Sequence, residues 1–324
     1  MNNQKNGASL NLIKNPYAPA IIGSILLLAL GRILSKGFLS SNNLSSILMT
    51  TAILTMASIA QATVIISGDS GLDMSVGAIM SLTALFGPMV RLPNEGISLV
   101  VMIIVVIAIG ALIGFLNGIG VQVFKIVPLV MTLIMSNVVN GFAIFVTKGQ
   151  PMVQVSSLLQ SISKPLIGPI RILTAIVIIL LVVLEIFFLR RSRYGKMLFL
   201  SGNNVNAARL CGINSKWVVI LAYTISGGIA GFAGLLLVGY AGTAQMNMAS
   251  SYTMLSIAAV VIGGTKLTGG KGTYIGGALG ALVLILITYI LQALNMAAGL
   301  RSLIQGVILV VILMINSRAP KLRQ

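Results

Sequence analysis

Ten long apolar runs, separated by short polar, proline or glycine breaks, fill most of the 324 residues. The runs cover residues 18–36, 44–66, 74–92, 97–119, 127–147, 171–189, 217–240, 246–264, 273–294 and 299–316. A helix of about 20 apolar residues crosses the hydrocarbon core of a bilayer. Because 57% of the residues are apolar and only 8% are charged, a soluble domain of this length could not bury them. The sequence therefore predicts an all-α membrane protein, a polytopic bundle of about ten transmembrane helices in one domain over residues 1–324.

The distribution of basic residues predicts the orientation. The chain has 21 Lys and Arg against four Asp and Glu, a net charge of +17. With the N-terminus inside, the cytoplasmic segments hold about twice as many basic residues as the opposite side, as the positive-inside rule requires. Both termini are then cytoplasmic, with short tails 1–17 and 317–324, and loop 190–216 carries the largest basic group. The excess charge is expected to face anionic lipid and not nucleic acid.

Two absences limit the chemistry of the chain. The sequence has no histidine and a single cysteine, Cys211, so a disulfide framework, a zinc site and histidine acid–base catalysis are excluded. The first apolar run lacks a cleavage site of the signal-peptide type and is expected to be retained. We expect no catalytic residue, metal ion or cofactor. An intramembrane enzyme built on serine and lysine is the alternative that these absences leave open.

A glycine-rich stretch at 263–273 resembles a phosphate-binding loop but fails its spacing. That loop needs a glycine, four residues, and then Gly-Lys-Ser/Thr. If Lys271 is aligned with the lysine of that loop, Thr265 stands where the first glycine is needed. Gly272 stands where serine or threonine is needed. The stretch is therefore expected to be a tight cytoplasmic turn, and ATP would have to be bound by another protein.

The four acids include two candidate solute ligands, Asp69 and Asp73, in a polar, glycine-rich stretch at 67–73 without basic residues. This stretch is either a helix break inside the bilayer, as in transporters, or a cytoplasmic turn. Carboxylates accept hydrogen bonds from sugar hydroxyls, so Asp69, Asp73 and Ser75 are candidate substrate-path residues. The alternative is that Asp73 caps the next helix through the amide of Ser75 or Val76.

A third acid, Glu185, lies near the end of the run 171–189. One interpretation is a step in a proton pathway. The other, which the sequence favours, is a side chain that reaches toward the membrane surface and pairs with Arg190 or Arg191.

Loop 190–216 predicts a short helix outside the membrane. Asn203 or Asn204 can cap it, Ala207 to Cys211 continue it, and Gly212 ends it in a left-handed conformation. A two-turn helix is too short to be stable alone, so it is expected to dock on its own bundle or on a partner.

Glycines recur at four-residue spacing in three of the apolar runs. They are Gly110, Gly114 and Gly118; Gly227 and Gly231; and Gly272, Gly276 and Gly280. Small faces of this kind allow close helix approach, either within one bundle or at a dimer or sliding contact.

Six short motifs together resemble a known family in their order and spacing. They are 71–77 (Gly-Leu-Asp-Met-Ser-Val-Gly), 193–195 (Arg-Tyr-Gly), 202–203 (Gly-Asn), 207–213 (Ala-Ala-Arg-Leu-Cys-Gly-Ile), 258–265 (Ala-Ala-Val-Val-Ile-Gly-Gly-Thr) and 269–272 (Gly-Gly-Lys-Gly). Over roughly residues 40 to 316 the chain is similar to the ribose-type permeases of bacterial ABC importers. One departure is that Ser67-Gly68-Asp69-Ser70 precedes the first motif, like a short insertion with an extra acid.

The resemblance implies a transmembrane permease subunit of an ATP-driven importer in the cell inner membrane. Its partners would be two cytoplasmic ATPase subunits, a second permease copy or a similar chain, and an extracytoplasmic solute-binding protein. The fold would be like that of the vitamin B12-type importer permeases, with a pathway at the dimer interface. The helix near 203–213 would be the coupling helix that enters a cleft on the ATPase. Its residues are Asn204, Ala207, Ala208, Arg209, Leu210 and Gly212.

The implied solute is a monosaccharide such as ribose or a similar small polar molecule. Nucleosides, autoinducer and branched-chain amino acids stay as alternatives. An ion-coupled secondary transporter is a further alternative, which needs intramembrane acids; the pair Asp69 and Asp73 is the candidate.

Overall fold

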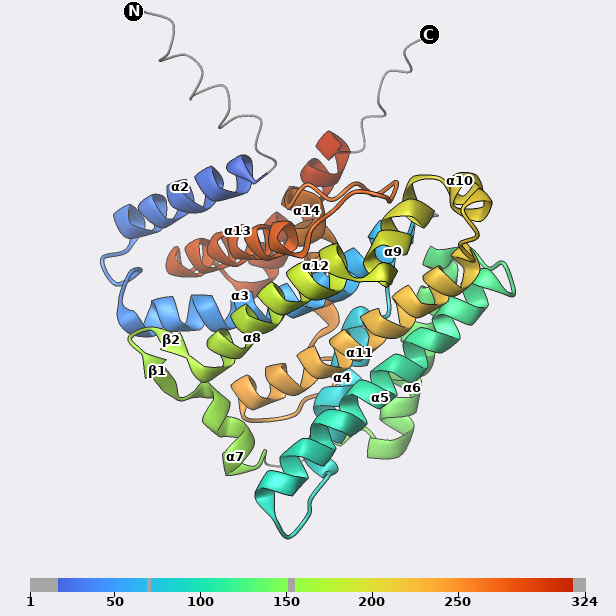
Figure 1. Cartoon of the computed structure of the whole chain (residues 1–324). Helices are drawn as coiled ribbons and strands as arrows, with labels where there is room; N and C mark the ends of the chain where they lie inside the picture. The colour runs from blue at the N-terminus through green and yellow to red at the C-terminus, as the bar shows by residue number, and fades with distance from the viewer. Residues whose placement is uncertain (1–16, 69–70, 151–154, 317–324) are drawn as a thin grey trace, which may run out of the picture.

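The computed structural model describes residues 17–68, 71–150 and 155–316. These residues form a helical bundle with one two-stranded antiparallel ribbon (Figure 1). The helices that match apolar runs are α2 (Ala18–Leu34), α3 (Ser41–Ile66), α4 (Val76–Phe86), α5 (Glu95–Gln122), α6 (Pro128–Thr147), α8 (Ile172–Val183), α11 (Ser215–Ala241), α12 (Ser250–Ile262), α13 (Tyr274–Ala293) and α14 (Ala298–Asn316).

The prediction of an all-α membrane protein is confirmed, since each of the ten apolar runs coincides with a described helix. Among the described residues, six helical segments are long and apolar enough to cross a membrane: α3, α5, α6, α8 with its extension to Arg191, α11 and α13. Three shorter apolar segments are α2, Val76–Met89 and α12. The number of helices that cross the bilayer therefore stays a prediction, as does the likeness to vitamin B12-type permeases.

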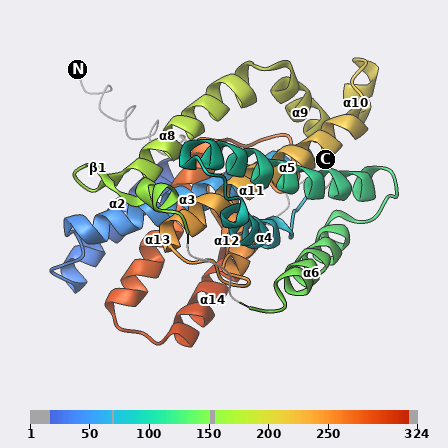
Figure 2. The same ribbon diagram turned by 90° about the horizontal axis from the view of Figure 1, so that it is seen from below.

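Helix α3 lies in the centre of the bundle. Every residue from 52 to 67 is buried, and α3 contacts α8, α11, α12 and α13. Figure 2, which looks at the bundle from below, shows α3 among these helices. The buried polar side chains of Ser58, Gln61 and Thr63 on α3 are tolerated because each makes hydrogen bonds inside the bundle.

The glycine repeats pack helices of the same chain against one another. In the pair α5 and α11, a Cβ atom at Gly110 would overlap the carbonyl of Gly227, and one at Gly114 would overlap the carbonyl of Tyr223. In the pair α12 and α13, a Cβ atom at Gly280 would overlap the carbonyl of Ala259. The interpretation as close packing within one bundle is confirmed for these faces.

The segment between α8 and α11 contains more helix than predicted. A π-helical extension of α8, Leu184–Arg191, leads into α9 (Arg193–Asn203) and then into α10 (Val205–Leu210). The side chain of Ser192 caps α9 by accepting a hydrogen bond of 2.8 Å from the Gly195 amide. Helix α9 was not predicted, because its sequence is too polar to form an apolar run.

The remaining elements lie at the other end of the bundle. The short helix α7 (Ser157–Gln160) precedes the ribbon of β1 (Pro165–Ile167) and β2 (Ile170–Arg171). In both views the ribbon and α10 are at opposite ends of the molecule (Figures 1 and 2). The ends of the bundle are therefore distinguished by structure: one carries the ribbon, and the other carries α10.

Candidate functional site

Helix α10 has the caps that the sequence predicts. The Asn204 side-chain oxygen accepts hydrogen bonds from the amides of Asn206 at 2.9 Å and Ala207 at 3.1 Å. Gly212 has φ +75°, the left-handed conformation that ends a helix at low cost for glycine. The predicted short helix and its boundaries are thus confirmed.

One face of α10 is left open. The Leu210 side chain is 89% exposed, and Arg209 and Ala207 are also exposed, whereas Ala208 is buried against the bundle. Figures 1 and 2 show α10 at the edge of the molecule, away from the central helices. The exposed face of α10 is therefore open to contact with another molecule.

The base of α10 is held by four glycines that meet backbone to backbone, here called the glycine junction: Gly68, Gly202, Gly269 and Gly270. A Cβ atom on Gly68 would lie 2.8 Å from Gly202 Cα, and one on Gly202 would lie 2.6 Å from the Gly270 amide nitrogen. The Gly270 amide also donates a 3.0 Å hydrogen bond to the carbonyl of Ile66. No larger residue fits here without moving a backbone.

The glycine junction brings together three motifs that are far apart in the sequence. Gly68 follows α3, Gly202 lies just before α10, and Gly269 and Gly270 belong to the loop between α12 and α13. The Asn203 amide adds a 3.0 Å hydrogen bond to the Gly270 carbonyl. The contact among these motifs was not predicted from the sequence. The one signal for it was that short glycine motifs recur in loops at several points of the chain.

The carboxylate of Asp73 lies fully buried between α3 and α4, and Asp69 lies outside the described residues. The Oδ1 atom of Asp73 accepts hydrogen bonds from the Ser75 amide at 2.9 Å and the Ser75 hydroxyl at 2.5 Å. Its Oδ2 atom accepts a 3.5 Å hydrogen bond from the Ser226 hydroxyl on α11. The Asn117 amide on α5 donates to the Ser75 hydroxyl at 2.9 Å. We call these four side chains the Asp73 network.

The backbone around Asp73 also has its partners inside the bundle. The side-chain amide of Gln61 pairs with both backbone groups of Asp73. Its nitrogen donates to the Asp73 carbonyl at 3.0 Å, and its oxygen accepts from the Asp73 backbone amide at 3.1 Å. The Thr132 hydroxyl accepts from the Met74 amide at 3.0 Å and donates to the Leu72 carbonyl at 3.3 Å. Irregular backbone of this kind is stable within a membrane protein only when protein groups satisfy it. Residues 71–75 thus form a helix break inside the bundle.

The predicted role of Asp73 as the N-cap of α4 needs a correction. Ser75 is the N-cap residue, and Asp73 lies two positions before it. The predicted partner is right, because the Asp73 carboxylate does bind the Ser75 amide. Both side chains are fully buried, so in this conformation neither offers an atom to a solute.

Glu185 is buried, with an exposed fraction of 1%, and does not reach the surface as predicted. Its pairing with Arg190 is confirmed, at 2.6 Å between Oε1 and Nε. Its Oε2 atom accepts a 2.8 Å hydrogen bond from the Tyr274 amide at the start of α13. The carboxylate stays inside because it stabilises the positive end of that helix.

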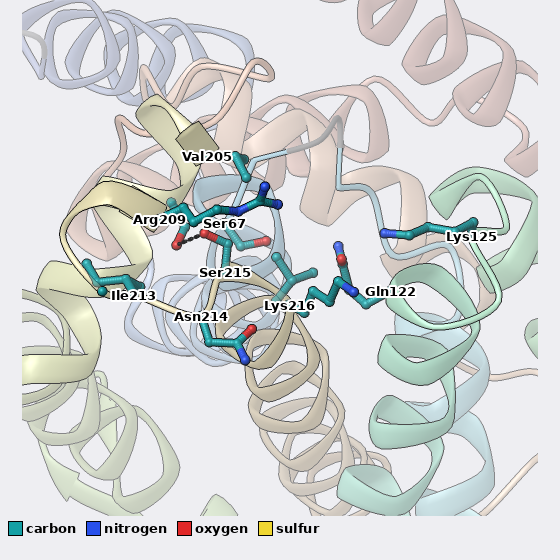
Figure 3. A pocket seen from close by; sticks show the side chains of 12 residues that line it. Ser67, Gln122, Lys125, Val205, Arg209, Ile213, Asn214, Ser215 and Lys216 are labelled. Carbon is teal, nitrogen blue, oxygen red and sulfur yellow. Dashed lines mark hydrogen bonds between the residues drawn. The ribbon is translucent and has the colours of Figure 1, made fainter. Parts of the chain in front are cut away.

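A cavity of about 510 Å³ opens beside α10 (Figure 3). Its lining comes from the ends of α3 and α5, from α9 and α10, and from the start of α11. The lining residues are Ser67, Gln122, Lys125, Ser201, Val205, Arg209, Gly212, Ile213, Asn214, Ser215, Lys216 and Val219. Among them, only Arg209 and Gly212 were predicted as candidate site residues, because tertiary packing brings the others together.

Metal chemistry finds no support in the described part of the chain. No group of three or more histidine, cysteine, aspartate or glutamate side chains lies close enough there to hold an ion. Cys211 is an exposed free thiol.

Known proteins resemble this chain over most of its length. The ribose import permease protein RbsC of Escherichia coli K12 is 29% identical over 306 residues, covering 92% of this chain and 93% of RbsC. The probable ABC transporter permease protein YphD of the same strain is 33% identical over 292 residues, covering 87% and 83%. The autoinducer 2 import system permease protein LsrC of Escherichia coli is 29% identical over 304 residues, covering 94% and 87%. No solved structure matches the chain.

A family model supports the same relationship. It is described as "Branched-chain amino acid transport system / permease component" and matches residues 43–313, which include every helix from α4 to α13. Over this range the structure has the apolar helices of a transmembrane transport protein. The chain therefore belongs to the branched-chain amino acid transport system / permease component family of ABC permeases.

Proposed function

We propose that the chain is the permease subunit of a binding-protein-dependent ABC importer and forms the path for a monosaccharide such as ribose or a similar small polar solute. ATP is hydrolysed by two cytoplasmic ATPase subunits and not by this chain. An extracytoplasmic binding protein delivers the solute, and a second copy or a similar permease completes the path. The whole chain is one transmembrane domain of a multi-pass protein of the bacterial inner membrane.

The single observation that carries this proposal is the placement of α10. The helix projects from the bundle, presents Arg209 and the 89% exposed Leu210, and is anchored at its base by the glycine junction. We assign Asn204, Ala207, Ala208, Arg209, Leu210 and Gly212 to the surface that meets the ATPase. Because the backbones at the glycine junction are in direct contact, a displacement of α10 also displaces the end of α3 and the α12–α13 loop.

The glycine junction also links α10 to the proposed substrate path. Gly68 is separated by a few residues from the helix break at 71–75 and its Asp73 network. We propose that motion of α10 loosens this break, so that Asp73 and Ser75 become accessible to solute. Asp69 is assigned to the same path from the sequence alone.

The orientation follows from the same placement. The end of the bundle with α10 carries Lys125, Arg209 and Lys216, and basic residues prefer the cytoplasmic side. We therefore place this end, both termini and the tails 1–17 and 317–324 in the cytoplasm, with the β1–β2 ribbon outside. All ten apolar helices cross or enter the bilayer in this arrangement.

The names of two related permeases support the proposal that the solute is small and polar. RbsC is named for ribose and LsrC for autoinducer 2, and both are 29% identical to this chain. We take the monosaccharide as the first solute to test, because the six motifs follow the order of the ribose-type permeases.

The test is uptake by proteoliposomes that contain the chain with its ATPase and binding protein. Labelled ribose, other monosaccharides, autoinducer 2, nucleosides and leucine are offered in parallel. ATP-dependent uptake of a monosaccharide, lost in Arg209→Glu and retained in the control Lys164→Glu at the other end of the bundle, is the expected result. Uptake by the chain alone in a proton or sodium gradient would contradict the importer assignment.

A further inference from the structure

Three cations face the cavity beside α10 and lack acidic partners. Lys125, Arg209 and Lys216 line it, and no aspartate or glutamate does. Among the described residues, none of the three makes an ion pair. Figure 3 shows the Arg209 and Lys125 side chains directed from opposite sides into the space between α10 and the end of α5. Three unpaired positive charges around one cavity attract an anion.

A buried amide points into the same cavity. Gln122 is only 6% exposed, and its side chain makes no hydrogen bond with any described residue. The Gln122 amide lines the cavity and can therefore pair with a ligand there. In Figure 3 the Gln122 side chain extends from the end of α5 toward the cations. Its NH₂ group is therefore placed to donate hydrogen bonds to an anion in the cavity.

The N-terminus of α11 adds a further attraction for negative charge. This 27-residue helix begins at Ser215 on the cavity wall, and Asn214 provides no side-chain cap. The free amides and the dipole at such a helix start bind phosphate and carboxylate groups. The Ser201 hydroxyl donates to the Ser215 oxygen at 3.1 Å, which leaves the Ser215 hydroxyl hydrogen available for a ligand.

The surroundings of the cations indicate a lipid and not a protein partner. Phe124, next to Lys125, is 72% exposed, and Trp217, next to Lys216, is 55% exposed. Aromatic side chains at this position in a membrane protein lie at the level of the headgroups. Val123 and Leu221 continue the exposed apolar surface along α5 and α11 toward the bilayer. A phosphate in the cavity can thus carry acyl chains that lie against these side chains.

We propose that this cavity binds the phosphate of an anionic phospholipid headgroup, with Lys125, Lys216 and Gln122 as its main ligands and Arg209 at its rim. Basic pockets at the cytoplasmic ends of transmembrane helices are suited to such headgroups. The bound lipid would lie beside α10 and support the base of that helix. The proposal does not depend on the solute or on the ATPase contact.

Native mass spectrometry of the purified chain tests the proposal. Phosphatidylglycerol is added in parallel with phosphatidylcholine, which has a phosphate but no net charge. The expected result is retention of phosphatidylglycerol and about thirtyfold weaker retention by the double variant Lys125→Gln, Lys216→Gln, since each of the two lysines contributes about fivefold to binding of an anionic headgroup. The matched control, Lys148→Gln with Lys164→Gln, removes the same charge at the other end of the bundle and should bind like the wild type.

A second variant and a second ligand make the result decisive. Gln122→Leu keeps the side-chain size and all charges, and it should also weaken phosphatidylglycerol binding. Inorganic phosphate at millimolar concentration should not displace the lipid, because it lacks the acyl chains. Equal retention of both lipids, equal loss in the control variant, or full displacement by inorganic phosphate would each overturn the lipid site.

Discussion

The side-chain amide of Asn203 donates a 3.0 Å hydrogen bond to the carbonyl of Gly270, across 67 positions of sequence. This bond ties the residue before α10 to the loop between α12 and α13. It lies beside the glycine junction and adds a side-chain hydrogen bond to a contact that is made mainly by backbone. The relationship gives a direct way to weaken the base of α10 without changing the exposed face of that helix.

Asn203→Ala removes this bond and is expected to lower ATP-coupled uptake severalfold. The free energy of unfolding should fall by about 1 kcal/mol, the usual contribution of one hydrogen bond. Uptake and membrane abundance are measured in the same cells. Asn42→Ala is the matched control, because the Asn42 side chain at the start of α3 is exposed and makes no side-chain hydrogen bond with a described residue. Equal uptake by the two variants would show that the Asn203 bond has no role in coupling.

Gly202→Ala is expected to destabilise the protein by about 1–3 kcal/mol, as overpacking does in a filled core. The added methyl group would overlap the Ile66 carbonyl and lie 2.6 Å from the Gly270 amide nitrogen. Thermal unfolding of the detergent-solubilised protein reports the change. Gly23→Ala in α2 is the control, since nothing lies within 4 Å of its Cβ position, and its stability should be unchanged or slightly higher. An unaltered transition for Gly202→Ala would contradict the close contact.

Asp73→Asn separates a structural role from a solute contact. Asparagine keeps the acceptor for the Ser75 amide and can donate to Ser226, so fold and abundance should be retained. Asp73→Ala leaves the Ser75 groups unpaired and should cost about 1–3 kcal/mol. Solute affinity of the assembled transporter is measured for both. Normal uptake by Asp73→Asn would end the idea that the charge of Asp73 contacts solute.

Glu185→Gln is expected to lower the free energy of unfolding by about 1–3 kcal/mol. The substitution removes the ion pair with Arg190 and places a neutral group at the start of α13. Arg190→Gln leaves the bond from the Tyr274 amide intact and should cost less. Denaturation of both variants under the same conditions shows which substitution lowers the free energy of unfolding more. A larger loss for Arg190→Gln would show that the pair matters more than the helix start.

Local patterns were sufficient to predict the helices and the ends of α10. Hydrophobic runs identify membrane helices because burial in lipid depends mainly on composition, and Asn204 and Gly212 identify caps because their bonds are local. The predicted run 171–189 covers most of the π-helical extension, whereas α9 escaped prediction because its polar, basic sequence resembles a loop. The glycine junction, the Asp73 network and the cation-lined cavity depend on packing among α3, α5, α9, α11 and α12. A hydropathy pattern carries no information on those contacts.

The account depends most on α10 being a cytoplasmic helix that the ATPase covers. Cys211, the only cysteine of the chain, is exposed directly after α10 and needs no engineering to report on it. A membrane-impermeant maleimide is applied to intact cells and to inverted vesicles, with and without the ATPase. We expect no labelling in cells, labelling in stripped inverted vesicles, and protection when the ATPase is bound. Labelling from outside the cell, or equal labelling with and without the ATPase, would contradict the proposed coupling.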